Sequence, residues 1–405
     1  MKRYLSTSGE NGQADTTPPS GHDKRPSPVG TFASGATPRF SEEWIQGPAT
    51  LRTRLHRPPE TTTDAGEFVT SLTGITTSIP QMTGPDLLRE LLPVCETELE
   101  RHMKMAKDWY PHEYVPWDGA YNFATLGGDD WDPTQSTLSD ASRAALVGLL
   151  LTEDNLPSYH RMIAEHVSLD DAWGAWVGRW TAEEMRHSTV IRDYLVVTRG
   201  VDPVQLDIAR TRNAMTGFNP LSRDRGLPEH SVGMLLAITY MAFHELASRV
   251  SQRNAAKSGA DPIVVRLLHR VAGDETLHML FYRNIIDSAL DLAPDQTMEA
   301  IYGIVTTFQM PGASPVPGSS PALGRIAALI AEGGIYDLHR HRSDVVVPLL
   351  RKWRVFERDD FGPTGQMYRD KLAGFLSELN QRVEKFDHAR AQASRPTAFS
   401  ERHPA

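Results

Sequence analysis

The chain has 405 residues, of which 40% are hydrophobic and 23% are charged, and its formal net charge is −9. This acidic balance argues against a general nucleic-acid binder, which would carry a basic domain or stripe. The single cysteine, Cys95, cannot form an intrachain disulfide, and no apolar run is long enough for a transmembrane segment or a secretory signal. We therefore expect a cytoplasmic protein.

Residues 1–82 are rich in Ser, Thr, Gly and Pro and show little hydrophobic periodicity, which predicts a disordered leader. Thr83, Pro85 and Asp86 then form a typical helix start. Helical periodicity continues from there, and residues 391–405 have the composition of a flexible tail. The predicted organisation is a leader, one domain over 83–390, and the tail.

Helical spacing of apolar residues dominates the predicted domain. The first helix carries a stripe formed by Leu88, Leu91, Cys95, Leu99, His102 and Ala106. Further helices are predicted over 140–165, 169–198, 229–257, 261–289, 296–308, 322–331 and 363–388. Pro157 falls inside the first of these and favours a bend or an end there. The prediction is an all-α fold, a bundle elaborated with additional helices.

Two helices contain Glu-x-x-His, as Glu184–His187 and as Glu275–His278. Residues at i and i+3 share a helix face, so both side chains can reach one ion. The motif alone is a weak signal, because polar pairs on exposed helix faces also produce it. Here both pairs lie on the apolar seam of their helix, where an unpaired carboxylate is costly.

Two single glutamates, Glu153 and Glu245, occupy the same kind of position at regular spacing. Glu153 precedes Glu184 by 31 residues, and Glu245 precedes Glu275 by 30. The chain thus repeats a helix with one Glu followed by a helix with Glu-x-x-His. Two such hairpins would bring four carboxylates and two imidazoles together, as in ferritin-like di-iron and di-manganese proteins. The competing interpretation, buried salt bridges, is disfavoured because no Lys or Arg lies on these seams.

At these residues the sequence resembles the soluble acyl-carrier-protein desaturases, particularly their actinobacterial branch. The resemblance covers about residues 84–390. The segments that carry it are DWYPHEYVPW, LGGDDWDP, LTEDNLPSYHRMI, WTAEEMRHSTVIRDYLVVTRGVDP, FHELASRVSQRNAAKSGADP, AGDETLHMLFYRN and FQMPG.

The resemblance implies a dimeric ferritin-like four-helix di-iron bundle that uses dioxygen to desaturate an acyl chain on acyl-carrier protein. A ferredoxin-type protein would donate the electrons. The ligands of the two irons would be Glu153, Glu184, His187, Glu245, Glu275 and His278, with Glu184 and Glu275 bridging. Trp109, His187 and Asp274 match the electron-relay positions of the family.

The residues around the predicted ligands depart from the family pattern. Met185 and Ser188 flank the first histidine where Asn and Gly are usual, and His244 replaces the Gln before the third carboxylate. Ser248 replaces a Thr, which keeps a hydroxyl beside the predicted oxygen site. Separately, Arg249, Arg253 and Lys257 form a basic stripe that could dock the acidic carrier protein or be a solvated face.

Other activities stay open from the sequence. The nearest alternative is a di-iron hydroxylase or other oxygenase acting on a carrier-bound acyl or aminoacyl group, because it would use the same ligands. Iron storage and a catalytically silent carrier-protein binder are further alternatives. His102 and the remaining histidines are expected to have structural or surface roles.

Overall fold

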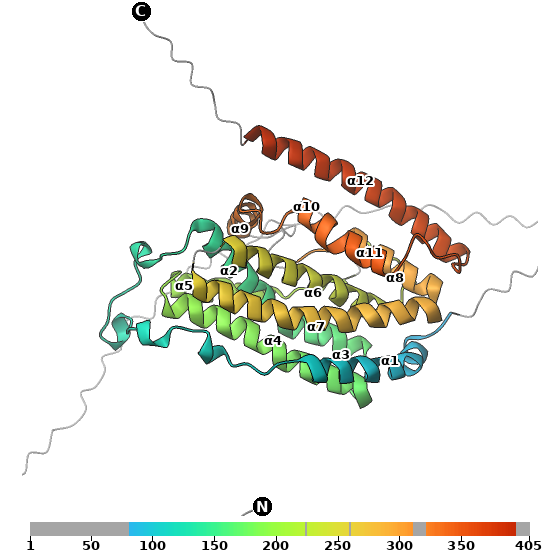
Figure 1. Ribbon diagram of the computed structural model, residues 1–405, viewed down its shortest axis with the longest axis horizontal. Helices are drawn as coiled ribbons and strands as arrows, with labels where there is room; N and C mark the ends of the chain where they lie inside the picture. Colours follow the sequence, from blue (N-terminus) through green and yellow to red (C-terminus); the bar gives the residue numbers. More distant parts are fainter. Residues whose placement is uncertain (1–80, 223–224, 259–260, 311–320, 394–405) are drawn as a thin grey trace, which may run out of the picture. The chain divides into compact units, whose positions relative to one another are not determined.

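The computed structural model describes residues 81–222, 225–258, 261–310 and 321–393, and every regular element within these ranges is helical. The predicted leader and tail lie almost wholly outside the described residues. The α-helices (Figure 1) are α1 (Gly84–Met105), α2 (Asp140–Glu153), α3 (Leu156–His166), α4 (Asp171–Val197), α5 (Pro203–Thr216), α6 (Gly233–Ser258), α7 (Pro262–Leu292), α8 (Pro294–Thr307), α9 (Pro321–Glu332), α10 (Leu338–Arg340), α11 (Val347–Lys352) and α12 (Pro363–Ala393). Short 3-10 turns are η2 (Pro111–Glu113), η3 (Trp117–Gly119), η4 (Ala124–Leu126) and η5 (Pro133–Gln135), and η7 (His341–Val346) is a π-helix.

Local capping signals fix where several helices begin. Thr83 and Asp86 form a capping box, in which each side chain accepts a hydrogen bond from the backbone N–H of the other, at 3.3 Å and 3.4 Å. The predicted helix start at Thr83 is confirmed. Asp261 caps α7 in a similar way by accepting from the N–H of Ile263 at 2.7 Å.

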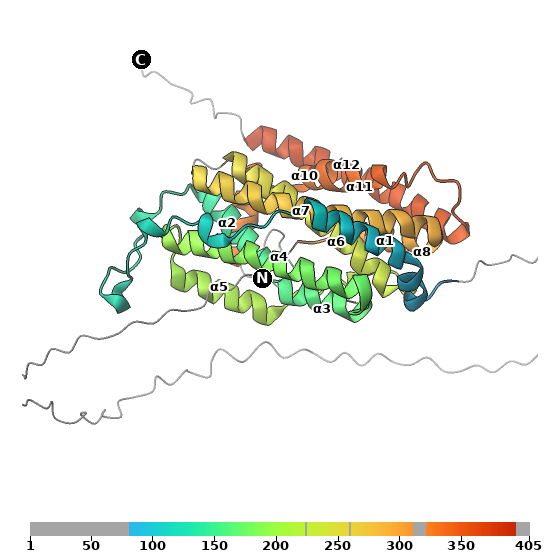
Figure 2. The same ribbon diagram turned by 60° about the horizontal axis from the view of Figure 1, so that its bottom comes forward.

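Helices α2, α4, α6 and α7 form a ferritin-like four-helix bundle, and this confirms the predicted fold class. The pairs α6–α7, α2–α4, α2–α6 and α4–α7 are all in contact. Helix α1 packs against α7, α4 and α6, while α3 packs against α4 and α6. Figure 2 shows α10, α11 and α12 along one side of the bundle and α3 and α5 along the other.

The core runs along the seam between the bundle helices and is rich in aromatic side chains. Trp173, Trp176 and Trp180 from α4 are each 1% exposed. Trp176 stacks on Phe281 of α7 with ring centroids 3.6 Å apart. Such large, rigid side chains fix the spacing of α4 and α7, which carry the two Glu-x-x-His pairs. Within the described residues, no helix combines the length and apolar character needed to cross a bilayer.

The structure differs from the predicted elements at a few places. The single helix expected over 140–165 is wrong: α2 ends at Glu153 and α3 begins at Leu156. Pro157 lacks the N–H that would bond the Glu153 carbonyl, so the helix cannot continue through this point. Helix α6 starts at Gly233, after a turn in which Ser231 N–H donates to the Pro228 carbonyl. Helix α5 and the π-helix were not predicted, because their apolar periodicity is weak.

A pair of leucines on α7 tests the packing of the core. Leu290 is 0% exposed and Leu292 is 37% exposed. Leu290→Ala is expected to lower the free energy of unfolding by about 2–5 kcal/mol, because it removes apolar contacts and leaves a cavity. Leu292→Ala, the matched control, is expected to cost under about 1.5 kcal/mol. Urea denaturation of both variants measures the difference, and equal losses would contradict the described burial.

Candidate metal centre

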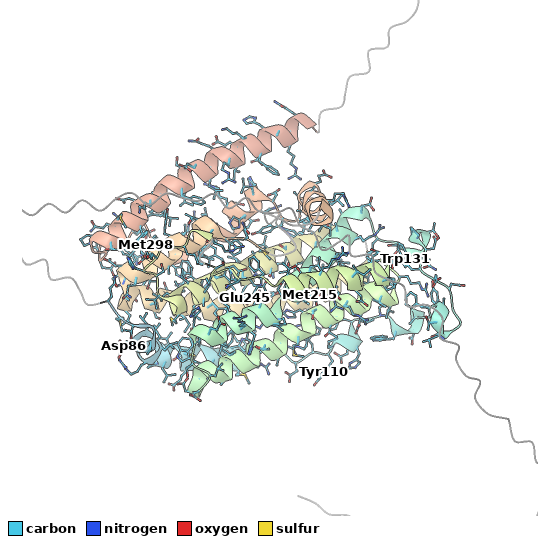
Figure 3. The ribbon with its side chains drawn as sticks, turned by 180° about the vertical axis from the view of Figure 1, so that it is seen from behind. Asp86, Tyr110, Trp131, Met215, Glu245 and Met298 are labelled. Carbon is cyan, nitrogen blue, oxygen red and sulfur yellow. The ribbon has the colours of Figure 1, made fainter. Side chains whose placement is uncertain are left out.

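The bundle brings all six predicted ligand residues into one buried space. They come from the four bundle helices: Glu153 from α2, Glu184 and His187 from α4, Glu245 from α6, and Glu275 and His278 from α7. None is more than 6% exposed. Figure 3 shows Glu245 midway along the bundle, with Asp86 and Met298 near one end and Trp131 near the other.

The six side chains form two overlapping groups. One contains Glu153, Glu184, His187 and Glu275, and the other contains Glu184, Glu245, Glu275 and His278. The ligand atoms within each group all lie within 4.8 Å of one another. Glu184 and Glu275 belong to both groups, so each could bridge two ions.

The distances around the two imidazoles follow the same pattern. The Nδ1 atom of His187 lies 3.3 Å from a Glu184 oxygen, 3.6 Å from Glu275 and 3.8 Å from Glu153. The Nδ1 atom of His278 lies 2.7 Å from Glu184, 3.5 Å from Glu275 and 3.6 Å from Glu245. Each imidazole therefore turns the same nitrogen toward three carboxylates.

Several of these atoms lack a hydrogen bond although they are fully buried. They are Nδ1 of His187, Nδ1 of His278, Oε1 of Glu184 and Oε2 of Glu275. Buried polar atoms without partners are costly, and metal coordination would satisfy all four. Carboxylate oxygens with imidazole nitrogens suit iron or manganese better than structural zinc, which prefers Cys and His. The residues therefore fit a pair of hard divalent ions.

The charge balance leads to the same conclusion. Within the described ranges, the ion-pair partners of the four carboxylates are histidines, and no Lys or Arg is among them. Burial, followed by repulsion from Glu275, raises the pKa of Glu153 to about 8. Burial and the carboxylates of Glu184 and Glu275 raise the pKa of Glu245 well above its usual range. In the absence of metal, bound protons therefore neutralise part of the negative charge that cations would otherwise balance.

The imidazoles also gain positive charge from their surroundings. Burial alone lowers the pKa of His187, but the carboxylates of Glu184 and Glu275 outweigh burial and raise it well above the usual value. Burial also lowers the pKa of His278, but its contacts with Glu183 and Glu184 outweigh burial and raise this pKa well above the usual value. Since a ligating imidazole must be neutral, metal binding would release these protons.

The outer nitrogen of His187 faces Asp274. Its Nε2 lies 3.5 Å from an oxygen of Asp274, which also accepts from the indole N–H of Trp109 at 2.7 Å. Arg186 donates to the same carboxylate at 3.2 Å, and Arg270 pairs with it as well. Trp109, Asp274 and His187 thus form one continuous chain of polar contacts.

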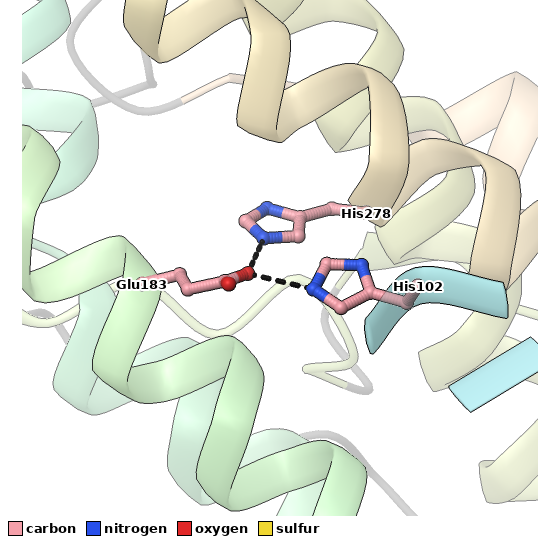
Figure 4. Close-up of side chains that lie close together, drawn as sticks. All are labelled: His102, Glu183 and His278. Carbon is pink, nitrogen blue, oxygen red and sulfur yellow. Dashed lines mark hydrogen bonds and ion pairs between the residues drawn. The ribbon is translucent and has the colours of Figure 1, made fainter. Parts of the chain in front are cut away.

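Sequence reasoning missed the corresponding carboxylate on the other side, Glu183. Its Oε2 lies 2.9 Å from Nε2 of His278 and 3.0 Å from Nε2 of His102, and Figure 4 shows the three side chains together. The signal was present, because Glu183 precedes Glu184 as Asp274 precedes Glu275. His102 also lay on the predicted apolar stripe of α1, but it was expected to have only a structural or surface role.

Two further residues in contact with the cluster were not identified from the sequence. Gln252 of α6 is 0% exposed and donates to Glu275 at 2.7 Å and to Glu153 at 3.3 Å. The indole N–H of Trp180 donates to Glu245 at 3.0 Å. Gln252 follows Glu245 by two helical turns, so the face of α6 that carries Glu245 could have revealed it.

The remaining predicted site residues lie on α6. Ser248 is 1% exposed, one turn after Glu245, and its hydroxyl has no hydrogen-bond partner. Arg253 and Lys257 are exposed, whereas Arg249 is half-buried and its Nε makes no hydrogen bond. The predicted basic stripe is therefore an exposed surface at two of its three positions.

A small apolar cavity lies between α2, α6 and α9. Its lining residues are Ala145, Gly148, Leu149, Thr152, Ser251, Met310, Ile330 and Ile335. Thr152 directly precedes Glu153 in the chain, and Ser251 directly precedes Gln252. None of the six clustered residues is among those that line the cavity.

Several known proteins are similar to this chain. The family model described as fatty acid desaturase matches residues 84–402. The putative acyl-(acyl-carrier-protein) desaturase DesA1 of Mycobacterium tuberculosis is 46% identical over 307 residues, covering 76% of this chain and 89% of that protein. The chloroplastic acyl-(acyl-carrier-protein) desaturase 7 of rice is 28% identical over 336 residues, covering 78% of this chain and 80% of its own.

Among solved structures, the putative acyl-ACP desaturase DesA2 of Mycobacterium tuberculosis H37Rv resembles the chain with a TM-score of 0.54 and 32% identity. That match covers 70% of this chain and 98% of the DesA2 chain. The family match extends over most of the sequence and includes all six clustered residues. The chain therefore belongs to the fatty acid desaturase family.

Proposed function

We propose that the protein is an oxygen-dependent di-iron desaturase that introduces a double bond into an acyl chain carried on acyl-carrier protein. The observation that carries the proposal is the pair of overlapping ligand groups that share Glu184 and Glu275. The relatives named as acyl-carrier-protein desaturases, which span most of this chain, support the choice of substrate.

In this proposal Glu153 and His187 would hold one iron, Glu245 and His278 would hold the other, and Glu184 and Glu275 would serve both. The iron pair would supply the activation of dioxygen and the oxidation of a C–H bond. Overall, two C–H bonds break and one C=C bond forms. Dioxygen becomes two waters by taking two hydrogen atoms from the acyl chain, two electrons from an external donor and two protons from solvent.

The chain's own residues orient the ligands and exclude water. Trp180 holds the Glu245 carboxylate by its indole N–H, and Gln252 ties Glu275 to Glu153. The free hydroxyl of Ser248 would lie beside the dioxygen position and offers a hydrogen bond there.

Electrons are proposed to reach the centre along Trp109, Asp274 and His187, because these side chains form a continuous contact path. The donor would be a ferredoxin-type protein. Arg253 and Lys257 provide exposed positive charge for the acidic carrier protein, although the chain as a whole is acidic. A homodimer, a cytoplasmic location and a domain over residues 83–390 also remain predictions.

The ligand assignment is tested by Glu275→Ala. This variant removes a carboxylate shared by both groups, so we expect it to bind fewer than two ferrous ions per chain in anaerobic titration. Glu299→Gln is the matched control, because Glu299 is also buried, at 3% exposed, but accepts from Tyr368 away from the cluster. Full two-ion loading of Glu275→Ala would contradict the assignment.

The dependence of metal binding on pH provides a second test. The pKa of Glu153 is raised to about 8, so below that pH its carboxyl must lose a proton to bind an ion. A group with a raised pKa stabilises the metal-free fold at low pH, and this contribution is lost as the pH rises toward that value. Both effects predict that the increase in melting temperature caused by divalent metal grows between about pH 6 and about pH 8. Calorimetry with and without metal measures it, and a constant increase would refute the prediction.

Docking of the carrier protein is tested by Arg253→Glu. Reversing an exposed charge is expected to weaken the binding of acyl-carrier protein by about tenfold at low salt and by less at high salt. Arg89→Glu makes the same charge change on α1, where Arg89 already pairs with Asp86, and it should leave the affinity near that of the wild type. Equal losses in both variants would assign the effect to net charge.

Product analysis separates desaturation from the alternative, hydroxylation. Anaerobically reconstituted protein would be given dioxygen, a reducing system and a panel of acyl-carrier substrates. Desaturation yields an acyl chain lighter by two hydrogen atoms, whereas hydroxylation yields one heavier by one oxygen atom. A product with added oxygen would replace the desaturase proposal with the oxygenase one.

A further inference from the structure

We propose that His102 of α1 is a positioning residue for the metal centre. It holds Glu183 against His278 and thereby supports the ion position formed with Glu245, while leaving the other position unaffected. This inference rests on the proposed function, because it assumes that the two ligand groups bind metal. It assigns a role at the centre to α1, which lies outside the four bundle helices.

A single oxygen of Glu183 contacts both histidines. One oxygen of Glu183 lies 2.9 Å from Nε2 of His278 and 3.0 Å from Nε2 of His102 (Figure 4). Both histidines are 0% exposed and Glu183 is 3% exposed. The same His278 turns its Nδ1 toward the bridging carboxylates. Glu183 therefore contacts only the nitrogen that faces away from the proposed ion.

His102 is itself held in a fixed orientation by the core. Its ring stacks on that of His278 at 5.8 Å between centroids, with an interplanar angle of 22°. It also meets the edge of Trp176 at 5.1 Å and 86°. Because these contacts restrict the imidazole, they hold its Nε2 at a defined point, 3.0 Å from the Glu183 carboxylate.

The second oxygen of Glu183 already forms ion pairs with two arginine side chains. Arg179 lies 2.5 Å from it and Arg186 lies 3.7 Å away. Without His102, these guanidinium groups would draw the carboxylate away from His278, because charged donors compete strongly for it. The arginine on the second oxygen also argues against a third metal ion among His102, Glu183 and His278.

On the His187 side of the centre, the acidic residue that contacts the histidine is held by an indole and not by an imidazole. Helix α4 supplies Glu183 to the histidine of α7, and α7 supplies Asp274 to the histidine of α4. On the Asp274 side the outer partner is the indole of Trp109, at 2.7 Å. The short segment 102–109 thus contacts both outer carboxylates, through an imidazole on one side and an indole on the other.

Outer partners of ligand histidines fix the ring orientation, and their loss typically costs about 10- to 100-fold in metal affinity. We therefore expect His102→Leu to weaken binding of one of the two divalent ions by about that factor and to leave the other unchanged. His102→Gln places an amide N–H near the position of Nε2 and should restore most of the affinity. Trp109→Phe should instead affect the ion on the His187 side.

The experiment is an anaerobic titration of the full-length protein with Co²⁺, followed by Mössbauer spectroscopy after loading with ⁵⁷Fe²⁺. We expect His102→Leu to change one of the two iron signals. We expect Trp109→Phe to change the other signal. His339→Leu is the control, because that imidazole pairs with Asp387 at 3.0 Å on the exposed surface. It should bind both ions like the wild type, and thermal unfolding of each metal-free variant monitors the fold.

The outcomes separate this inference from the proposed function. If the wild type does not bind two ions, the metal assignment itself fails. If the wild type binds two and His102→Leu binds both with unchanged affinity and spectra, only the role of His102 is refuted. Equal perturbation of both iron signals would also refute it, since His102 would then act through the fold. If His102→Leu does not fold, His102→Gln decides by the same two measurements.

Discussion

The structure depends on one constraint: four carboxylates and two imidazoles share a space from which water is excluded. Ionised carboxylates are costly to bury unless they are paired, and the described residues place no Lys or Arg against these four. Two divalent cations would balance four negative charges with the imidazoles neutral. Without metal, protons offset part of this charge, because burial and the carboxylate of Glu275 raise the pKa of Glu153 to about 8.

Two similar helical hairpins form the cluster, and a carboxylate from each contacts the histidine of the other. Each Glu-x-x-His helix provides a Glu and a His of the cluster and, one residue before that Glu, an acidic side chain that contacts the histidine of the other helix. The two halves therefore stabilise each other, and neither histidine is oriented by its own helix alone. The aromatic packing between α4 and α7, with Trp176 stacked on Phe281, keeps the helices at the separation that these contacts need.

Much of the bundle and the six clustered residues could be predicted, because both depend on local periodicity. The seams around Glu184 and Glu275 have the same spacing, and a helix preserves such spacing in space. The contacts of His102 and Gln252 could not be derived in this way, since they depend on how helices dock. The break at Pro157 was recognised as a bend or an end, but the sequence did not distinguish between them. Helix α5 was missed because its single buried residue, Leu206, leaves almost no apolar pattern.

The contact between Trp109 and Asp274 joins residues 165 positions apart, so it closes one of the longest loops in the fold. Contacts of this kind form late, because their loop entropy must be offset by structure already in place. His102 of α1 and Trp109 beyond it therefore reach the two outer carboxylates only when this part of the chain is docked on α4 and α7. Any ion that binds only this docked state stabilises the docking of α1 by mass action. The availability of metal would thus influence how firmly α1 is held against the bundle.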